Sequence, residues 1–487
     1  MRPARQFSRH APWAYASVLA LLCNANLASA QEAPLTTHAD KEPILAAEEA
    51  TENAAARSVV IPASEIILFD LLLSNYNRRF SGSSDYDVST ATVRRNLHGP
   101  WVVDNDPFKI NQFAHPYQGS LYHGAARSAG LTYWQSAALT FAGSAWWEIT
   151  GEQTPPSRND QIASGIAGSL LGEPLFRMAH LLLSHDGGVP HVWREWGAAA
   201  ISPGVGLNRL MFGSRFDAAF ADHDPAYHGR LRIGTNHATE QAVGTSTKFK
   251  PNELELDYSL DYGMPGKPDY TYRRPFDYFT FRAVVSSANG IQNLATGGLL
   301  YGTDYALGDM HRGIWGLYAN YDYVAPQIFH ISATSLSLGT TGQWWLPMDL
   351  ALQATGLAGI GYAAASTAHG VADDRDYHYG TAPRLGLAWR LTASDRASAD
   401  FSAQKYFLGR VANRSAGRDD IARIDTALTW RVTGRHAVGM KYVWSHRSAS
   451  YPVIGDRRQT LATAGIFYTL LGEDGFGVVD WRTPAAH

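Results

Sequence analysis

The stretch Glu253-Leu254-Glu255-Leu256-Asp257-Tyr258-Ser259-Leu260-Asp261-Tyr262 decides the fold of this chain. Carboxylates and one hydroxyl alternate with leucine and tyrosine, so polar side chains share one face of a β-strand and apolar side chains share the other. Lipid tails offer no hydrogen-bond partners, so an antiparallel sheet can cross a bilayer only by closing on itself. Behind an export signal, such strands predict a transmembrane antiparallel β-barrel in an outer membrane.

Alternation and turn residues predict about twelve strands, an even number that is usual for bacterial barrels. The expected strands lie near 227–236, 253–263, 277–288, 295–307, 313–325, 328–346, 350–363, 377–392, 397–409, 420–433, 436–448 and 458–471. Gly434 and Arg435 suit a two-residue turn between the tenth and eleventh strands. The chain then runs on to His487, whereas strands of this class commonly finish on a terminal aromatic residue.

The polar faces of these strands carry charges of both signs, which are costly against lipid and tolerated in a hydrated lumen. A lining of one sign would indicate an ion-selective pore, so the mixture favours a salt-bridged, plugged interior. The charged residues on these faces are Arg230, Arg232, Glu253, Glu255, Asp257, Arg282, Arg384, Arg390, Asp400, Arg423, Asp425, Arg431 and Lys441.

The N-terminus fits an export signal at 1–30, with three early arginines, an apolar core at 14–22 and a small-residue cleavage site before Gln31. Cys23 is the only cysteine, and Leu22 stands where a lipobox needs a small residue, so cleavage after Ala30 is favoured. The mature chain would then lack disulfides and thiolate chemistry. Removing the three signal arginines leaves 38 basic against 44 acidic residues, which argues against nucleic acid as a partner.

Three further segments follow the signal. Residues 31–63 are rich in Ala, Glu, Thr and Pro and predict a disordered periplasmic leader. Residues 64–216 form a helical motif region, and 217–487 form the barrel. The aromatic content of 12% and the low charged content of 17% fit a barrel, and equally fit a secreted all-β protein with a wet surface.

The helical motif region begins with an amphipathic helix at 64–80 and continues with small-residue-rich helices. Two apolar runs, 131–150 and 162–183, carry many Ala, Gly and Ser residues, which allow helices to approach closely. A helical pair in the inner membrane would stop export of the strands behind it. We therefore expect these helices to be packed in or beneath the barrel as a plug or a periplasmic brace.

The helical motif region also holds the densest group of polar residues that can carry chemistry. Histidines and carboxylates among apolar helices could bind a metal, or act as acid and base in hydrolysing a lipid or glycan bond. The candidate residues are His115, His123, Glu148, Glu152, Asp160, Glu173 and His180. The structural alternative is a buried Glu173–Arg177 ion pair, with His115 and His123 donating to turn carbonyls. No HExxH spacing is present, so the sequence leaves a metal undetermined and predicts no cofactor.

Spacing along the chain leaves the local geometry of these residues open. Glu148 and Glu152 would share a helix face, but Gly151 between them indicates a frayed helix end equally well. Glu173, Arg177 and His180 would share a stripe, although Pro174 predicts a break or a helix start.

Five motifs in the helical motif region resemble the uncharacterised bacterial outer-membrane family known as domain of unknown function 3943. They are the run Asn111-Gln112-Phe113-Ala114-His115-Pro116-Tyr117-Gln118-Gly119-Ser120-Leu121-Tyr122-His123-Gly124-Ala125-Ala126-Arg127, the pairs Trp147-Glu148 and Gly151-Glu152, Asn159-Asp160-Gln161, Gly172-Glu173-Pro174-Leu175-Phe176-Arg177, and Pro203-Gly204 with Leu207-Asn208-Arg209. The likeness covers roughly residues 62 to 216. It implies an exported, outer-membrane protein of Gram-negative bacteria, and no activity.

Three hypotheses follow. The first is an outer-membrane barrel with a helical plug or brace that serves envelope integrity or small-solute passage. The second is a membrane-embedded hydrolase of lipid or lipopolysaccharide that uses the histidines and carboxylates above. The third and weakest is a soluble periplasmic binding module. Under the first two, the expected partners are outer-membrane lipid, lipopolysaccharide and the barrel-assembly machinery during insertion.

Overall fold

A computed structural model describes residues 57–184, 190–213, 215–216, 224–243, 250–367, 375, 377–409, 417–451, 455–472 and 475–482. The export signal and most of the expected leader lie outside these residues, so both stay predictions. The first described helix already begins at Val60, inside the segment expected to be leader.

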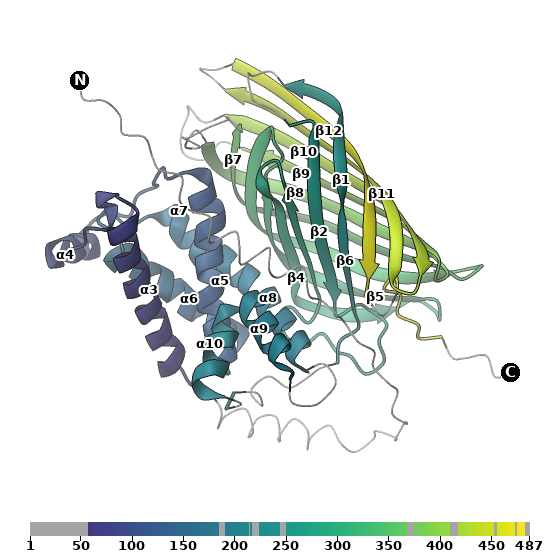
Figure 1. The fold of residues 1–487 in the computed structure, drawn as a ribbon, viewed down its shortest axis with the longest axis horizontal. Helices are drawn as coiled ribbons and strands as arrows, with labels where there is room; N and C mark the ends of the chain where they lie inside the picture. Colours follow the sequence, from purple (N-terminus) through teal and green to yellow (C-terminus); the bar gives the residue numbers. More distant parts are fainter. Residues whose placement is uncertain are drawn as a thin grey trace.

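Twelve antiparallel strands close into a barrel, as the sequence predicts (Figure 1). The strands are β1 (Tyr227–Val243), β2 (Asn252–Tyr262), β3 (Phe279–Ser286), β4 (Gly290–Ala306), β5 (His311–Val324), β6 (Phe329–Leu346), β7 (Leu350–Thr367), β8 (Tyr377–Ala393), β9 (Ala397–Leu408), β10 (Arg418–Thr433), β11 (His436–Tyr451) and β12 (Gly455–Leu471). Closure comes from β1, which pairs with β2 on one side and with β12 on the other. We call the end where β1 begins and β12 ends the entry end, and the opposite end the far end.

Tight turns join several strands at the entry end. Between Thr433 and His436, Gly434 and Arg435 make the predicted two-residue turn, and Gly434 has φ +50°. A residue with a Cβ adopts that backbone conformation at a cost, which is why glycine suits the position. Short turns on the side of the chain termini are the usual arrangement in outer-membrane barrels.

The two faces of the strands differ in the way that the alternation predicts. In β10, Trp430 is 65% exposed and faces outward. Asp425 lies an odd number of positions away on the same strand, so it faces the lumen, and it is buried. Charged side chains meet across strands that are not neighbours: Lys441 of β11 lies 2.8 Å from Asp257 of β2, and Arg282 of β3 lies 2.8 Å from Asp425 of β10. These charges therefore face one another across the lumen. The exterior is apolar and the interior is ion-paired, which is the architecture of a transmembrane β-barrel.

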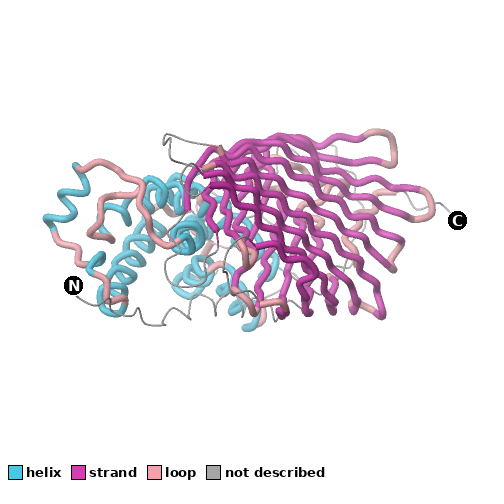
Figure 2. The backbone as a smooth tube through the Cα atoms, turned by 90° about the horizontal axis from the view of Figure 1, so that it is seen from above, coloured by secondary structure: helices cyan, strands magenta, loops and turns pink. Residues whose placement is uncertain are grey.

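A bundle of helices precedes the barrel and lies to one side of it (Figures 1 and 2). Its elements are α3 (Val60–Phe80), η1 (Ser84–Tyr86), α4 (Thr90–His98), η2 (Ile110–Ala114), α5 (His115–Ser128), α6 (Tyr133–Thr150), α7 (Arg158–Asp160), η3 (Gln161–Ala167), α8 (Gly168–Ser184), α9 (Val192–Ile201) and α10 (Pro203–Phe212). Within the described residues, no helix combines the length and the apolar composition needed to cross a bilayer.

The small residues of the bundle allow the close approach that the sequence predicts. Gly119 of α5 and Gly168 of α8 cross so closely that a Cβ on Gly119 would lie 1.9 Å from the carbonyl oxygen of Ser164. A Cβ on Gly168 would in turn lie 2.6 Å from the Cα of Gly119. No side chain fits at either position without separating the two helices.

Local signals explain where α6 begins and ends. Thr132 and Gln135 form a capping box at the start of α6, and Gly151 caps its end, so Glu152 lies beyond the helix. The expectation that Pro174 breaks or starts a helix is wrong, because α8 runs through it. Buried neighbours on both sides of Pro174 hold the helix together, and tertiary packing often overrides such a local penalty.

The helices contact the outer wall of the barrel, not its lumen, so the expectation of a plug or a brace beneath the barrel is corrected. Strand β2 gives the clearest evidence. Its outward-facing Leu254 is 64% exposed near the far end, whereas Leu260 and Tyr262, which face the same way, are each 3% exposed. The two buried residues belong to one apolar core with helical residues such as Leu171 and Met178.

We give the name docked wall to these outward-facing residues of β2 to β5 in this core: Leu260, Tyr262, Phe279, Phe281, Ala283, Leu294, Ala319, Tyr321 and Tyr323. The docked wall starts near the entry end of β2 and reaches the far end of β5. It therefore crosses the barrel diagonally. Phe113 of η2 packs against Tyr323 with 5.7 Å between ring centroids, and Tyr133 of α6 stacks on Phe276 at 5.5 Å.

Residues 475–482 fold back onto the entry end of the lumen, which explains why the chain continues past β12. The backbone of Val479 exchanges two hydrogen bonds with the lumen-facing amide of Gln343, at 2.6 and 3.0 Å. Trp481 donates its indole N–H to the Asp309 carbonyl at 2.8 Å. The C-terminal segment thus helps to close this mouth of the barrel.

Candidate functional site

The predicted site residues fall into two clusters of the helical bundle, and the lumen contributes a separate cavity. The first cluster, which we call the Asp104 cluster, contains Asp104, His115, Glu148, Glu152 and Asp160. Asp104 is its centre, since it accepts hydrogen bonds from the side-chain amides of Asn111 and Asn159, each at 2.6 Å.

The residues of the Asp104 cluster come from the segment before η2, from the start of α5, from α6 and the residues after it, and from α7. His115 lies 3.1 Å from the Ser164 hydroxyl, and its Nε2 lies 3.7 Å from Asp160 Oδ2. Glu148 accepts the backbone N–H of Ser157 at 2.8 Å. Glu152 accepts the Trp147 indole N–H at 3.1 Å. The expectation that His115 donates to a turn carbonyl is therefore wrong, because its hydrogen-bond partner is a hydroxyl.

Burial suppresses the charge of this cluster. It raises the pKa values of Glu148 and Asp160 well above their usual range, and neighbouring carboxylates raise them further. Burial followed by the charge of Asp106 raises the pKa of Glu152 to about 7. Burial lowers the pKa of His115 to about 4 despite the opposing effect of Asp104. At neutral pH the carboxyls of Glu148 and Asp160 are thus protonated and the imidazole of His115 is neutral, while the pKa of Glu152 lies close to neutral pH.

The Asp104 cluster is also joined to the outer wall of the barrel, at strand β8. The amide of Asn111 donates to the Tyr377 hydroxyl and that of Asn159 to the Tyr379 hydroxyl, both at 2.9 Å. Both tyrosines belong to β8. Arg384 and Arg390 of the same strand face the lumen at even-numbered positions, so the odd-numbered Tyr377 and Tyr379 face outward. The Asp104 cluster therefore helps to attach the helical bundle to the barrel.

The second cluster, which we call the Glu173 cluster, is an ion-pair network with no exposed charge. Glu173 accepts from His123 at 3.0 Å, from Arg127 at 2.7 and 3.1 Å, and from Arg177 at 2.9 Å. Arg177 also pairs with Asp277 of the β2–β3 connection at 3.2 Å. The predicted buried Glu173–Arg177 pair is confirmed, while the predicted donation from His123 to a turn carbonyl is wrong.

Charge balance sets the protonation of the Glu173 cluster. Burial by itself would raise the pKa of Glu173, but the Arg127 guanidinium, the His123 hydrogen bond and Arg177 outweigh it and hold the pKa well below the usual range. Burial lowers the pKa of His123. For His180, burial and then Arg127 lower the pKa to about 3. His180 packs on Phe176 at 4.5 Å between ring centroids, apart from the carboxylates of the Asp104 cluster.

The structure thus separates the seven predicted residues into two groups and adds members that sequence reasoning missed. Asp104 lies within the helical motif region but outside its motifs and its two apolar runs, so it was not singled out from the sequence. Arg127 closes the longest family-like motif, which was a usable signal. Asp70 pairs with Tyr122 from a helix that the sequence offered no reason to join to α5.

Two crevices beside these clusters in the described part of the chain are small. The crevices beside His180 and beside Asn159 each have a volume of about 10 Å³, roughly enough for one water molecule. Among the described residues, no group of three or more His, Cys, Asp or Glu side chains is placed to hold a metal ion. Catalytic and metal-binding roles for these residues stay predictions.

A cavity of about 260 Å³ lies in the lumen, between two closures. At the far end, lumen-facing apolar residues form a second core that includes Val324, Phe329 and Ile331. At the entry end, the C-terminal segment occupies the mouth, and Met264 of the β2–β3 connection reaches the cavity wall. Among the described residues, apolar side chains thus narrow one end of the lumen and the C-terminal segment lies across the other.

Residues 100–204 match the family model described as Domain of unknown function (DUF3943), which confirms the resemblance found in the sequence. A comparison with curated proteins finds no match.

Among solved structures, the NanC porin matches 48% of this chain and 98% of its own, at 10% identity and a TM-score of 0.25. The outer membrane channel DcaP of Acinetobacter baumannii matches 52% and 99%, at 11% identity and 0.22. An outer membrane channel from Pseudomonas putida F1 matches 52% and 99%, at 11% identity and 0.27. Scores this low support no inference about a transported solute. The hydrolase alternative gains no support from these comparisons.

Proposed function

We propose that this protein is an outer-membrane barrel that carries the helical bundle on its lipid-facing wall and serves envelope integrity, with its lumen closed at rest. The observation that carries the proposal is the burial of outward-facing strand residues under helices. A barrel wall at the level of the bilayer is normally covered by lipid, so a docked bundle lies beside lipid as well.

Exposed apolar residues on the bundle support this placement. Phe141 and Trp146 of α6 and Ile166 of η3 are each more than 40% exposed on its surface. Large apolar side chains that gather on a surface mark contact with lipid or with another protein. Outer-membrane lipid and lipopolysaccharide therefore remain the expected surroundings, and the barrel-assembly machinery remains the expected partner during insertion.

The closed lumen argues against free diffusion of solutes. An apolar core fills one mouth, ion pairs cross the middle, and the C-terminal segment fills the other mouth. Small-solute passage is the second candidate function, because the enclosed cavity could hold a solute if either closure moved.

Conductance in a planar bilayer tests the closed state. We expect the purified full-length protein to insert and remain electrically silent, while an open porin reconstituted in parallel conducts. Steady conductance by the unaltered protein would contradict a closed lumen and favour the passage of small solutes.

The role in envelope integrity has its own test. Cells that lack the protein should admit vancomycin, which an intact outer membrane excludes. Unchanged exclusion of vancomycin would argue against that role.

A further inference from the structure

The lumen cavity has a wall with more positive than negative charge. Its lining includes six arginines and four aspartates. The arginines come from β1, β3, β8 and β10, so the surplus positive charge surrounds the cavity instead of lying on one strand. Asp257, just outside this lining, pairs with Arg282, so the surplus is a local property of the cavity wall and not of the whole lumen.

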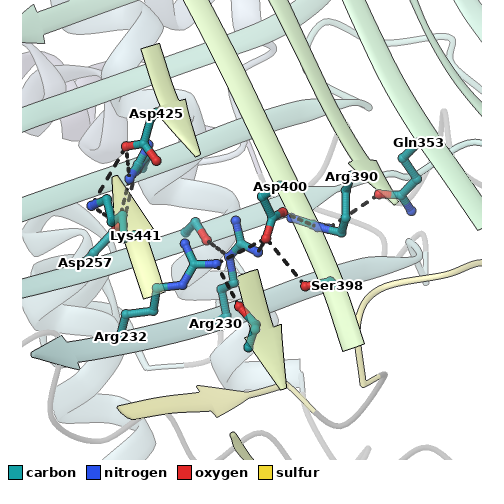
Figure 3. A network of polar contacts seen from close by, with 12 residues as sticks. Arg230, Arg232, Asp257, Gln353, Arg390, Ser398, Asp400, Asp425 and Lys441 are labelled. Carbon is teal, nitrogen blue, oxygen red and sulfur yellow. Dashed lines mark hydrogen bonds and ion pairs between the residues drawn. The ribbon is translucent and has the colours of Figure 1, made fainter. Parts of the chain in front are cut away.

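The surplus is clearest at Asp400, where three guanidinium groups converge (Figure 3). Arg230 and Arg232 reach the same oxygen, Asp400 Oδ2, at 2.8 and 3.2 Å, while Arg390 reaches Oδ1 at 2.8 Å. The second carboxylate of the group is Asp261, 3.0 Å from Arg390. Two carboxylates therefore serve three guanidiniums, and like charges that share one oxygen repel each other.

Two other arginines of the wall keep donors available to the cavity. Arg423 donates to the neutral hydroxyl of Ser445 at 2.9 Å. Arg384 pairs with Asp322 through Nε at 2.9 Å, but its Nη1 is buried and has no hydrogen-bond partner among the described residues. A buried guanidinium donor without an acceptor is costly, and a bound anion would satisfy it.

We propose that the lumen cavity binds a small oxyanion, a carboxylate or a phosphate, through guanidiniums of its wall, which include Arg230, Arg384 and Arg423. Guanidinium is planar and matches the paired oxygens of both groups, and the enclosed site strengthens the attraction relative to water. The volume of about 260 Å³ admits an anion of a few heavy atoms with some water. A cation fits less well, because each aspartate of the wall already forms an ion pair with an arginine at 3.0 Å or less.

Calorimetric titration of the purified full-length protein in detergent tests this proposal, with sodium citrate and sodium phosphate as probes and ionic strength held constant with sodium chloride. We expect saturable binding of at least one probe. Citrate alone would identify a carboxylate site, and phosphate alone a phosphate site. Saturation by neither probe would overturn the proposal, whatever the conductance measurement shows, since an anion site does not depend on whether the lumen conducts.

Variants that change the charge of the cavity wall should shift the anion affinity in opposite directions. Arg230→Gln and Arg384→Gln should each weaken binding by about tenfold, the usual loss for one charge-assisted hydrogen bond. Asp261→Asn removes a negative charge from the wall, so it should tighten binding severalfold, an outcome that damage to the fold would not produce. Lys405→Gln is the matched control, because Lys405 is half-buried on β9 and pairs with Asp420 outside the cavity lining.

The heat-modifiable shift of each variant on a denaturing gel confirms that its barrel is closed before titration. If Arg230→Gln fails that check, Arg423→Gln replaces it, because Arg423 has a neutral partner and its loss strands no carboxylate. Equal weakening in Lys405→Gln, or weaker binding in Asp261→Asn, would contradict the proposed site.

Discussion

Asp70 is a carboxyl group that folding removes almost entirely from water. It lies on α3, is 2% exposed and accepts a short hydrogen bond from the Tyr122 hydroxyl of α5, which in turn accepts one from Gln118. Burial raises the pKa of Asp70 to about 7, against the smaller opposing effects of these two partners. The protonated form is therefore the one that the folded bundle prefers.

This preference makes the stability of the bundle depend on pH. An unfolded aspartate has a pKa near 4, so the contribution of Asp70 is complete below about pH 4 and is lost as pH rises through about 7. The loss is at most about 4 kcal/mol for a shift of three units. We expect the thermal midpoint of helix loss, followed by circular dichroism at 222 nm, to fall between pH 5 and 8, and to fall less in Asp70→Asn.

Asp87→Asn is the control for this experiment, because Asp87 is exposed at the same end of the chain. Its pH dependence should match that of the unaltered protein. Glu65 of α3, whose pKa burial also raises to about 7, keeps some slope in the Asp70 variant. An identical slope in Asp70→Asn and the unaltered protein would show that Asp70 is not a source of the dependence.

Sequence reasoning found most of the polar residues that matter here and missed how they pair. The Glu173–Arg177 pair follows from their i, i+4 spacing on a helix. Arg127 and Asp277 complete the same network from a separate helix and from a barrel loop, 46 and 100 residues away along the chain from their partners. Periodicity carries no information about such contacts, because they depend on how the elements pack.

At the scale of elements, the docked wall is what joins helices to strands. Phe113 on η2 is 8% exposed and packs against Tyr323, while Tyr321 donates its hydroxyl to the backbone carbonyl of Gln112 at 2.6 Å. On the uncovered wall, residues such as Leu338 of β6 remain 63% exposed. The same outward alternation thus serves lipid on one side of the barrel and helices on the other.

Truncating one side chain in this interface should loosen the bundle without opening the barrel. Phe113→Ala leaves a cavity and loses apolar burial, at a cost of about 3–5 kcal/mol. We expect limited proteolysis of the purified protein to cut within the helical bundle faster, while the heat-modifiable shift is retained. Leu338→Ala, on the uncovered wall of the same barrel, should leave proteolysis of the bundle unchanged.

If Phe113→Ala were as resistant to protease as Leu338→Ala, the docked wall would not be a stabilising interface.

Strand positions were predictable because the alternation of side chains is strictly local. The docked wall was not, because Leu260 and Tyr262 have the same alternation as the lipid-facing Leu254. Only tertiary contacts distinguish an outward residue under a helix from one against lipid.

At the scale of the whole molecule, the barrel combines an ion-paired interior with two kinds of exterior. The class of fold, the number of strands and the ion-paired lumen were predictable from the sequence, since each follows from alternation and charge on one face. The position of the helices was not. The small residues in 131–150 and 162–183 predict that these helices pack closely, but they do not identify the packing partner. In the structure the helices pack against one another in the bundle, outside the barrel.

The central claim is that the helical bundle lies on the outer wall, and cross-linking tests it most directly. In a chain with Cys23 replaced by serine, a short bismaleimide should join cysteines placed at Gln112 and Tyr379, whose side chains are hydrogen-bonded at 3.0 Å. The matched pair at Gln112 and Asn320, which lines the lumen cavity, should remain separate. Cross-linking of the lumen pair, with none at Gln112 and Tyr379, would contradict this arrangement and return the helices to the interior.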